Sequence, residues 1–198
     1  MLNLNLKKNK EIEIMNAAMK IYRKKGIDKT SIRDIMSETG YSLGSFYLYF
    51  TDKEDLKEKL VVNIAVDLVL KAENSCYEKD PVERYISFIN YIFDYFIDHP
   101  FELEIISQNI NWALYSKIEN DKDLKEAETT LQFILNRYES LFSSEYTYSQ
   151  KLYILSLTIE ILISTCKSTL MEGAILTIEE AKPVLYSLTK KMFYRDRR

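Results

Sequence analysis

Side chains that could carry out catalysis are few in this sequence. Its 198 residues include one histidine, His99, and two cysteines, Cys76 and Cys166. General acid–base or nucleophilic catalysis needs a nucleophile, a base and a group that orients the base, and these residues do not supply that set. The sequence also lacks a glycine-rich phosphate loop, an HExxH pattern and a CxxC pair. We therefore expect no enzyme activity, no metal site and no cofactor. The cysteines are predicted to be buried, reduced thiols, and His99 is predicted to cap a helix.

The residues best suited to contact a partner lie between positions 41 and 50. Of the ten residues in YSLGSFYLYF, five are aromatic and none is charged. On a helix that starts after Ser42, positions 46, 49 and 50 share one face and positions 43, 44, 47 and 48 the opposite face. This outward face consists of Leu43, Gly44, Tyr47 and Leu48, with Ser42 and Ser45 at its edges. An exposed face with two leucines and a tyrosine predicts a surface that a partner covers.

The charge distribution favours a polyanion as that partner. The net charge is −3, but residues 1–50 contain nine Lys/Arg and five Asp/Glu, which leaves +4 there and −7 on the rest of the chain. A basic head on an acidic body is suited to placing one end against nucleic acid.

The elements that must position these residues are predicted to be helices. Four glycines and three prolines are too few for a multi-stranded β architecture. Helical periodicity and capping residues predict about nine helices. They lie near 12–25, 31–39, 42–49, 52–74, 81–98, 101–116, 121–142, 148–172 and from Thr177, where Thr177 and Glu180 form a capping box. Pro183 is expected to bend the last helix or delay its start.

Two short helices joined by a glycine-containing turn, one turn after a longer helix, form the pattern of a helix-turn-helix. In this arrangement the inward side chains are Ile32, Ile35, Phe46, Tyr49 and Phe50.

Residues 30–56, TSIRDIMSETGYSLGSFYLYFTDKEDL, resemble the DNA-binding segment of the TetR family of transcriptional regulators. The positions that carry the resemblance are Thr30, Ile35, Gly40, Ser42, Tyr47, Tyr49, Phe50, Lys53, Glu54 and Leu56. The resemblance implies an all-α fold with a three-helix DNA-binding domain over 1–52. It also implies a helical domain over 53–198 that binds an effector and dimerises.

The resemblance also assigns roles to residues. Thr30, Ser31, Ser45, Tyr47 and Lys53 are expected to contact DNA phosphates. Base contacts are expected from Arg33, Ser42, Leu43, Gly44 and Leu48, since an arginine can bind guanine and a leucine can pack on a thymine methyl group. Met36, Thr39 and Tyr41 are larger than the residues usual in the family, and they are expected to widen or re-angle the two motif helices.

The resemblance further implies that the last two helices form the homodimer interface. One stripe of the helix at 148–172 contains Leu152, Leu155, Ile159, Leu162 and Cys166, and a second contains Ile154, Leu157, Ile161 and Met171. One stripe can pack on the chain's own core and the other on a partner subunit. Two-fold symmetry then implies a palindromic operator in double-stranded DNA.

An effector pocket is predicted from aromatic residues of the C-terminal domain. Its candidate lining is Tyr85, Phe88, Tyr91, Tyr95, Trp112, Tyr115 and Phe133, which would suit an apolar, aromatic or cationic molecule. Ordinary core packing is the alternative for each of them. Glu160, within the apolar run 152–163, could bind a cationic ligand, pair with Lys167 or face solvent.

The function predicted from the sequence is a ligand-responsive repressor that binds DNA as a dimer and is released by a small molecule. The alternative is a helical small-molecule-binding or adaptor protein without DNA binding. The N-terminus has lysines but no apolar run after them, and the run at 152–163 is too short to span a bilayer. The protein is therefore expected to be cytoplasmic, with no membrane partner.

Overall fold

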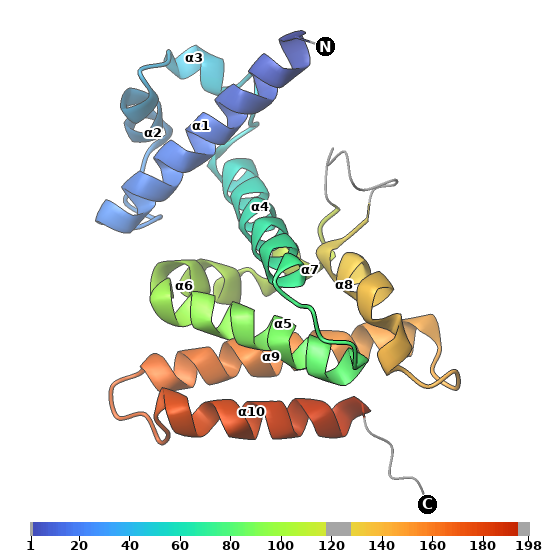
Figure 1. Cartoon of the computed structure of the whole chain (residues 1–198). Helices are drawn as coiled ribbons and strands as arrows, with labels where there is room; N and C mark the ends of the chain where they lie inside the picture. Colours follow the sequence, from blue (N-terminus) through green and yellow to red (C-terminus); the bar gives the residue numbers. More distant parts are fainter. Residues whose placement is uncertain (1, 118–127, 194–198) are drawn as a thin grey trace, which may run out of the picture. The chain divides into compact units, whose positions relative to one another are not determined.

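The computed structural model describes residues 2–117 and 128–193, with side chains from residue 9 onward. Within these ranges the regular elements are ten α-helices and one short 3-10 helix (Figure 1). The predicted all-α fold class is confirmed. The chain folds as two compact units, Met1–Leu60 and Val61–Arg198. The division falls within α4, and the predicted functional division at residue 52 stays a prediction.

The N-terminal unit consists of α1 (Leu2–Lys25), α2 (Ile32–Thr39), α3 (Leu43–Phe46) and the first turns of α4 (Lys53–Asn74). Helix α1 begins before the apolar periodicity that predicts it. The core is formed by side chains that are at most 2% exposed, namely Ile14, Ala18, Tyr22, Ile35, Met36, Phe46, Phe50, Leu56 and Leu60. The inward face predicted for the two short helices is confirmed at Ile35, Phe46 and Phe50, while Ile32 and Tyr49 are half-buried.

The C-terminal unit contains the rest of α4 and six further α-helices. They are α5 (Pro81–Asp98), α6 (Pro100–Gln108), α7 (Ile110–Tyr115), α8 (Thr130–Tyr138), α9 (Tyr148–Leu170) and α10 (Ile178–Phe193), with a 3-10 turn at Glu139–Leu141. Helix α9 packs against α5, α6, α8 and α10, and α5 also contacts α10 (Figure 1). Burial of Leu155, Leu162 and Cys166 places the first stripe of α9 in this core.

Two of the helices predicted in the C-terminal part of the chain differ from those observed. The helix expected at 101–116 is two helices, because Asn109 donates from Nδ2 to the Ile105 carbonyl oxygen at 2.7 Å and has a non-helical ψ of 34°. The helix expected at 121–142 lies partly outside the described residues, and α8 starts only after the Thr129 cap. Pro183 lies inside α10 and does not delay its start, since the predicted Thr177–Glu180 capping box sets that start.

By length and composition alone, α9 is the one helix in the described ranges that could cross a membrane. Its contacts with four other helices are those of the buried core helix that the sequence predicts.

Candidate nucleic-acid interface

The N-terminus of α2 is held by a complete capping box. Ser31 is the N-cap, and its Oγ accepts a hydrogen bond from the Asp34 backbone N–H at 3.2 Å. The Asp34 carboxylate in turn accepts from the Ser31 backbone N–H at 2.8 Å and from the Ser31 hydroxyl at 2.6 Å. Lys25 lies 2.7 Å from the same carboxylate. These partners hold the pKa of Asp34 well below its ordinary value, the Lys25 hydrogen bond contributing most and Ser31 next. The carboxylate therefore occupies the position that an anion would take at this helix end.

Thr30 lies inside the unit and not at its surface. Its side chain is 2% exposed, and its hydroxyl donates to the Gly26 carbonyl oxygen at 2.7 Å. A hydroxyl in this position stabilises the loop before α2 and presents no surface to a phosphate.

The turn between α2 and α3 depends on Gly40, which has a φ of 72° in the left-handed region. The Thr39 hydroxyl donates to the Met36 carbonyl oxygen at 2.8 Å and accepts from the Tyr41 N–H at 3.1 Å, which braces the same turn. Tyr41 lies against α1, where its hydroxyl is hydrogen-bonded to Glu13 and Lys10 lies over its ring. Met36 is fully buried. The fold thus accommodates Met36 in the core and places the Tyr41 ring on α1.

Helix α3 presents the outward face that its periodicity predicts. Leu43, Tyr47 and Leu48 are 39%, 59% and 67% exposed, and Gly44 is exposed as well. The regular helix ends at Phe46 and not near Tyr49, and residues 47–49 continue as turns with the Leu48 N–H bonded to the Ser45 carbonyl oxygen at 3.3 Å. The structure thereby brings Ser42, Leu43, Gly44, Tyr47 and Leu48 together on one surface.

The hydroxyl groups of Ser42 and Ser45, both predicted DNA contacts, differ in their hydrogen bonds within the protein. Ser42 is the N-cap of α3 but makes no side-chain cap hydrogen bond, so its hydroxyl is available. Ser45 donates its hydroxyl to the Ser42 carbonyl oxygen at 2.6 Å. Tyr47 packs its ring edge-on against Phe46, with the ring centroids 5.3 Å apart, which fixes the direction of the exposed hydroxyl end.

Lys53, at the start of α4, already has partners. Its Nζ donates to the Ile27 carbonyl oxygen at 3.2 Å and to the Thr30 carbonyl oxygen at 3.1 Å. The side chain is half-buried. The sequence could not reveal these bonds, because the lysine and the two carbonyl groups are 26 and 23 residues apart.

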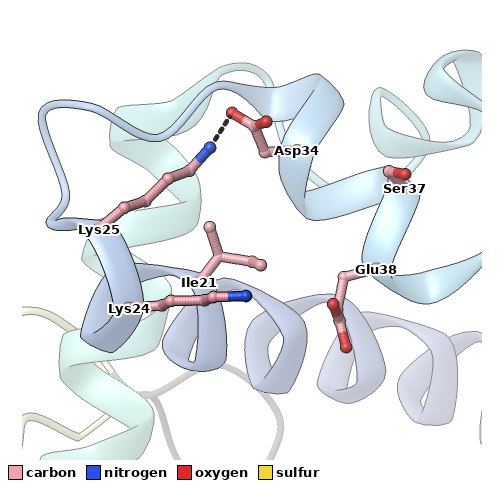
Figure 2. A pocket seen from close by; sticks show the side chains of 6 residues that line it. All are labelled: Ile21, Lys24, Lys25, Asp34, Ser37 and Glu38. Carbon is pink, nitrogen blue, oxygen red and sulfur yellow. Dashed lines mark ion pairs between the residues drawn. The ribbon is translucent and has the colours of Figure 1, made fainter.

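The remaining cations of this unit divide into paired and unpaired groups. Lys20 pairs with Glu38 and Lys25 with Asp34, and both pairs join α1 to α2. Between them lies a hollow of about 420 Å³, lined by Ile21, Lys24, Lys25, Asp34, Ser37 and Glu38 (Figure 2). Among the side chains described in this unit, the cations without an ion pair, hydrogen bond or ring contact are Lys24, Lys29 and Arg33.

The predicted effector-pocket residues do not all gather in one place. Tyr85 and Phe88 are fully buried and pack with Tyr138, a residue that the sequence-based prediction missed, at centroid distances of 5.0 and 5.4 Å. Phe133 is buried, Tyr91 and Trp112 are half-buried, and Tyr115 is half exposed. Tyr95 stacks on His99 with the ring centroids 4.1 Å apart, and Glu160 is exposed.

His99 caps α5 as predicted, with Nδ1 2.8 Å from the Tyr95 carbonyl oxygen. Lys167 contacts Ser107 and Glu104 and has no bond to Glu160.

A buried carboxylate in the C-terminal unit was also missed. Glu73, in the last turn of α4, is 6% exposed and forms an ion pair with Arg84 on α5. It also accepts a hydrogen bond from the Tyr138 hydroxyl on α8 at 2.7 Å. Burial and this carboxylate raise the pKa of Tyr138. An acidic residue at a helix C-terminus opposes the helix dipole, and that was the available signal that Glu73 needs a cationic partner.

Comparisons with known proteins agree with this geometry. Residues 14–60 match the family model described as bacterial regulatory proteins, tetR family. The uncharacterized HTH-type transcriptional regulator YvdT of Bacillus subtilis is 27% identical over 120 residues, which are 61% of this chain and 58% of that protein. The biofilm operon icaADBC HTH-type negative transcriptional regulator IcaR of Staphylococcus epidermidis is 27% identical over 130 residues, covering 64% of this chain and 67% of IcaR.

A solved structure has the same fold over 94% of this chain. The crystal structure of a putative TetR-family transcriptional regulator from Syntrophomonas wolfei superposes with a TM-score of 0.65 at 21% identity, covering 94% of this chain and 95% of that one. The chain spans from 27% to 58% of the length of three curated relatives, YvdT among them. The sequence similarity to these relatives is thus partial in length.

Proposed function

We propose that this chain, a member of the TetR family of bacterial regulators, is a repressor that binds double-stranded DNA through α2 and α3. The observation that carries this proposal is the α3 surface, on which Leu43, Gly44, Tyr47 and Leu48 are exposed together. Their neighbours Phe46 and Phe50 anchor the segment. A short helix with an apolar, uncharged outward face is suited to the major groove, where leucines can meet thymine methyl groups.

The contact set that we propose is narrower than the one inferred from the sequence. Base contacts come from Arg33, Ser42, Leu43, Gly44 and Leu48. The Tyr47 hydroxyl contacts a phosphate. Ser45, at the edge of this face, can contribute only if its hydroxyl leaves the Ser42 carbonyl oxygen. Thr30 is left out because its hydroxyl is buried on the Gly26 carbonyl oxygen. Ser31 can contribute only if a phosphate displaces the Asp34 carboxylate.

The test is binding of the purified protein to a duplex from its own upstream region. We expect a shifted complex that weakens as salt rises, since phosphate contacts release counterions. Changing Tyr47→Phe removes one hydrogen bond to a charged acceptor, worth roughly 1.5–3 kcal/mol. Affinity for all duplexes should then fall about 10- to 100-fold. The matched control is Tyr77→Phe, which removes a hydroxyl from a side chain that is 86% exposed in the other unit. Equal affinities for Tyr47→Phe and wild type would contradict the role given to Tyr47.

We also propose that the protein acts as a homodimer through α9 and α10 on a palindromic operator. Apolar side chains remain exposed on both helices, among them Tyr153 at 64%, Val184 at 48% and Leu188 at 46%. The second α9 stripe supports this as well, because Ile154, Leu157 and Ile161 are only half-buried within one chain.

Release by a small apolar, aromatic or cationic effector completes the proposed function. Its support is the aromatic packing of Tyr85, Phe88 and Tyr138 beside the Glu73 carboxylate. We expect tetraphenylphosphonium, an aromatic cation, to raise the melting temperature of the protein more than benzoate does. A larger rise with benzoate would favour an anionic effector instead. Cytoplasmic location belongs to the same proposal.

A further inference from the structure

The loop Gly26–Ser31 between α1 and α2 is held by hydrogen bonds within the loop and by one to the end of α1. The Gly26 N–H donates to the Tyr22 carbonyl oxygen at 2.8 Å, and the Thr30 N–H donates to the Ile27 carbonyl oxygen at 3.1 Å. The Thr30 hydroxyl donates to the Gly26 carbonyl oxygen at 2.7 Å. Gly26 has a φ of 83°, which this turn needs and which other residues rarely adopt. The loop therefore has a fixed shape that does not depend on a ligand.

Lys53 adds the bonds that tie this loop to α4. Its ammonium group donates to the carbonyl oxygens of Ile27 and Thr30, at 3.2 and 3.1 Å, and the side chain is half-buried. Two of its three N–H donors are thus used on neutral acceptors. A lysine held in this way acts as a brace, and moving it to a phosphate would break two hydrogen bonds.

The same loop carries Lys29, a cation that makes no such hydrogen bonds within the described residues. Lys29 is exposed and, within the described residues, has no hydrogen bond, ion pair or ring contact. Arg33, in the first turn of α2, is exposed and also has no hydrogen bond, ion pair or ring contact within the described residues. The neighbouring Asp28 is also exposed and works against an anion at this position.

We propose that Lys53 is a positioning residue that holds the Gly26–Ser31 loop, and that Lys29 on this loop takes the DNA phosphate. This inference rests on the proposed DNA binding. It reassigns the phosphate contact from a lysine that makes two hydrogen bonds inside the fold to one that makes none within the described residues.

Salt dependence separates the two roles. The slope of log affinity against log salt changes by about 0.9 for each phosphate that the protein no longer neutralises. We expect Lys29→Gln to reduce both the affinity and the slope, the latter by about 0.9. Lys53→Gln should reduce the affinity about tenfold and leave the slope unchanged, while Lys53→Arg restores affinity because a guanidinium can also donate to both carbonyl groups. Asp28→Asn should raise the affinity.

The Thr30 amide reports on the brace directly. Its hydrogen exchange should be faster in Lys53→Gln, with the melting temperature recording any global loss of stability. If Lys53→Gln does not fold, Lys29→Gln still tests the phosphate contact and Lys53→Arg still tests the brace. A slope reduced by Lys53→Gln and unchanged by Lys29→Gln would overturn the inference. A wild-type protein that binds no duplex would instead overturn the proposed function.

Discussion

Gly44 differs from the other glycines of the chain because the fold of the protein does not require a glycine at this position. Gly26, Gly40 and Gly173 have φ values of 83°, 72° and 76°, whereas Gly44 has no positive φ. A Cβ at Gly44 would meet no atom within 4 Å. Glycine in a helix costs roughly 0.5–1 kcal/mol relative to alanine. A residue that weakens the helix without serving the fold indicates that something outside the chain approaches it closely.

Gly44→Ala is therefore expected to stabilise the protein and to weaken DNA binding. The free energy of unfolding should rise by about 0.5–1 kcal/mol, measured by urea denaturation. Operator affinity should fall about tenfold, equivalent to roughly 1.4 kcal/mol, because the added methyl group meets the DNA surface. Gly173→Ala is the matched control. It should destabilise the protein by about 1–2 kcal/mol, because its φ is left-handed, and leave the intrinsic affinity for DNA unchanged. Unaltered binding by Gly44→Ala would remove Gly44 from the interface.

The sequence predicted such residues well where local periodicity decides their exposure. The faces of residues 43–50 follow from helical spacing alone, and the structure confirms them except at Tyr49, which is half-buried. Thr30 and Lys53 were different, since their hydroxyl and ammonium groups are used by carbonyl groups of the 26–30 loop. Hydrogen bonds between distant segments depend on the packed fold and leave no periodic signal in the sequence.

At the scale of elements, the start of α2 depends on the charge of Asp34. Its carboxylate binds Lys25 and Ser31, so the pKa of Asp34 is below its ordinary value in the folded protein. A lowered carboxyl pKa contributes stability that is complete above the ordinary value, about 3.9, and is lost as pH falls from there towards the folded pKa.

We expect Asp34→Asn to be less stable than wild type at about pH 7, with the gap narrowing once the pH falls below about 4. Urea denaturation of both proteins at about pH 7, 5 and 3 measures the difference in unfolding free energy directly. The titration of the other groups is shared by the two proteins. Glu38→Gln serves as a comparison, because Glu38 also pairs with a lysine of α1 but caps no helix. A gap that stays constant down to about pH 3 would show that Asp34 acts through something other than its charge.

Element boundaries were predicted where caps are local and missed where side chains compete with the backbone. The Thr177–Glu180 capping box set the start of α10 as expected. The break at Asn109 comes from a side-chain bond to the Ile105 carbonyl oxygen, which a sequence pattern does not distinguish from a helical asparagine. The Glu73–Arg84–Tyr138 contacts join three helices, so they required the tertiary structure.

At the scale of the whole molecule, the charge distribution and the exposed apolar side chains point in the same direction. Residues 1–50 carry a net charge of +4 while the chain as a whole carries −3. The positive charge attracts the N-terminal residues to DNA, and the negative charge on the rest of the chain disfavours contact with DNA. Val184 and Leu188, one helical turn apart on α10, remain nearly half exposed. A two-fold dimer would cover these side chains and would place two α3 helices on successive half-sites.

The double change Val184→Glu with Leu188→Glu is therefore expected to separate the subunits. Burying the exposed half of each apolar side chain contributes about half of the roughly 1.5–3 kcal/mol of full burial, and opposed glutamates in a two-fold interface would add repulsion. Sedimentation at micromolar concentration should give twice 23.4 kDa for wild type and a single 23.4 kDa chain for the variant. Operator affinity should fall with it, since each subunit then binds one half-site alone. Tyr77→Glu, an apolar-to-charged change outside α9 and α10, should remain dimeric. A variant that stays dimeric would move the interface away from this face of α10, and a monomeric wild type would remove the argument for a palindromic operator.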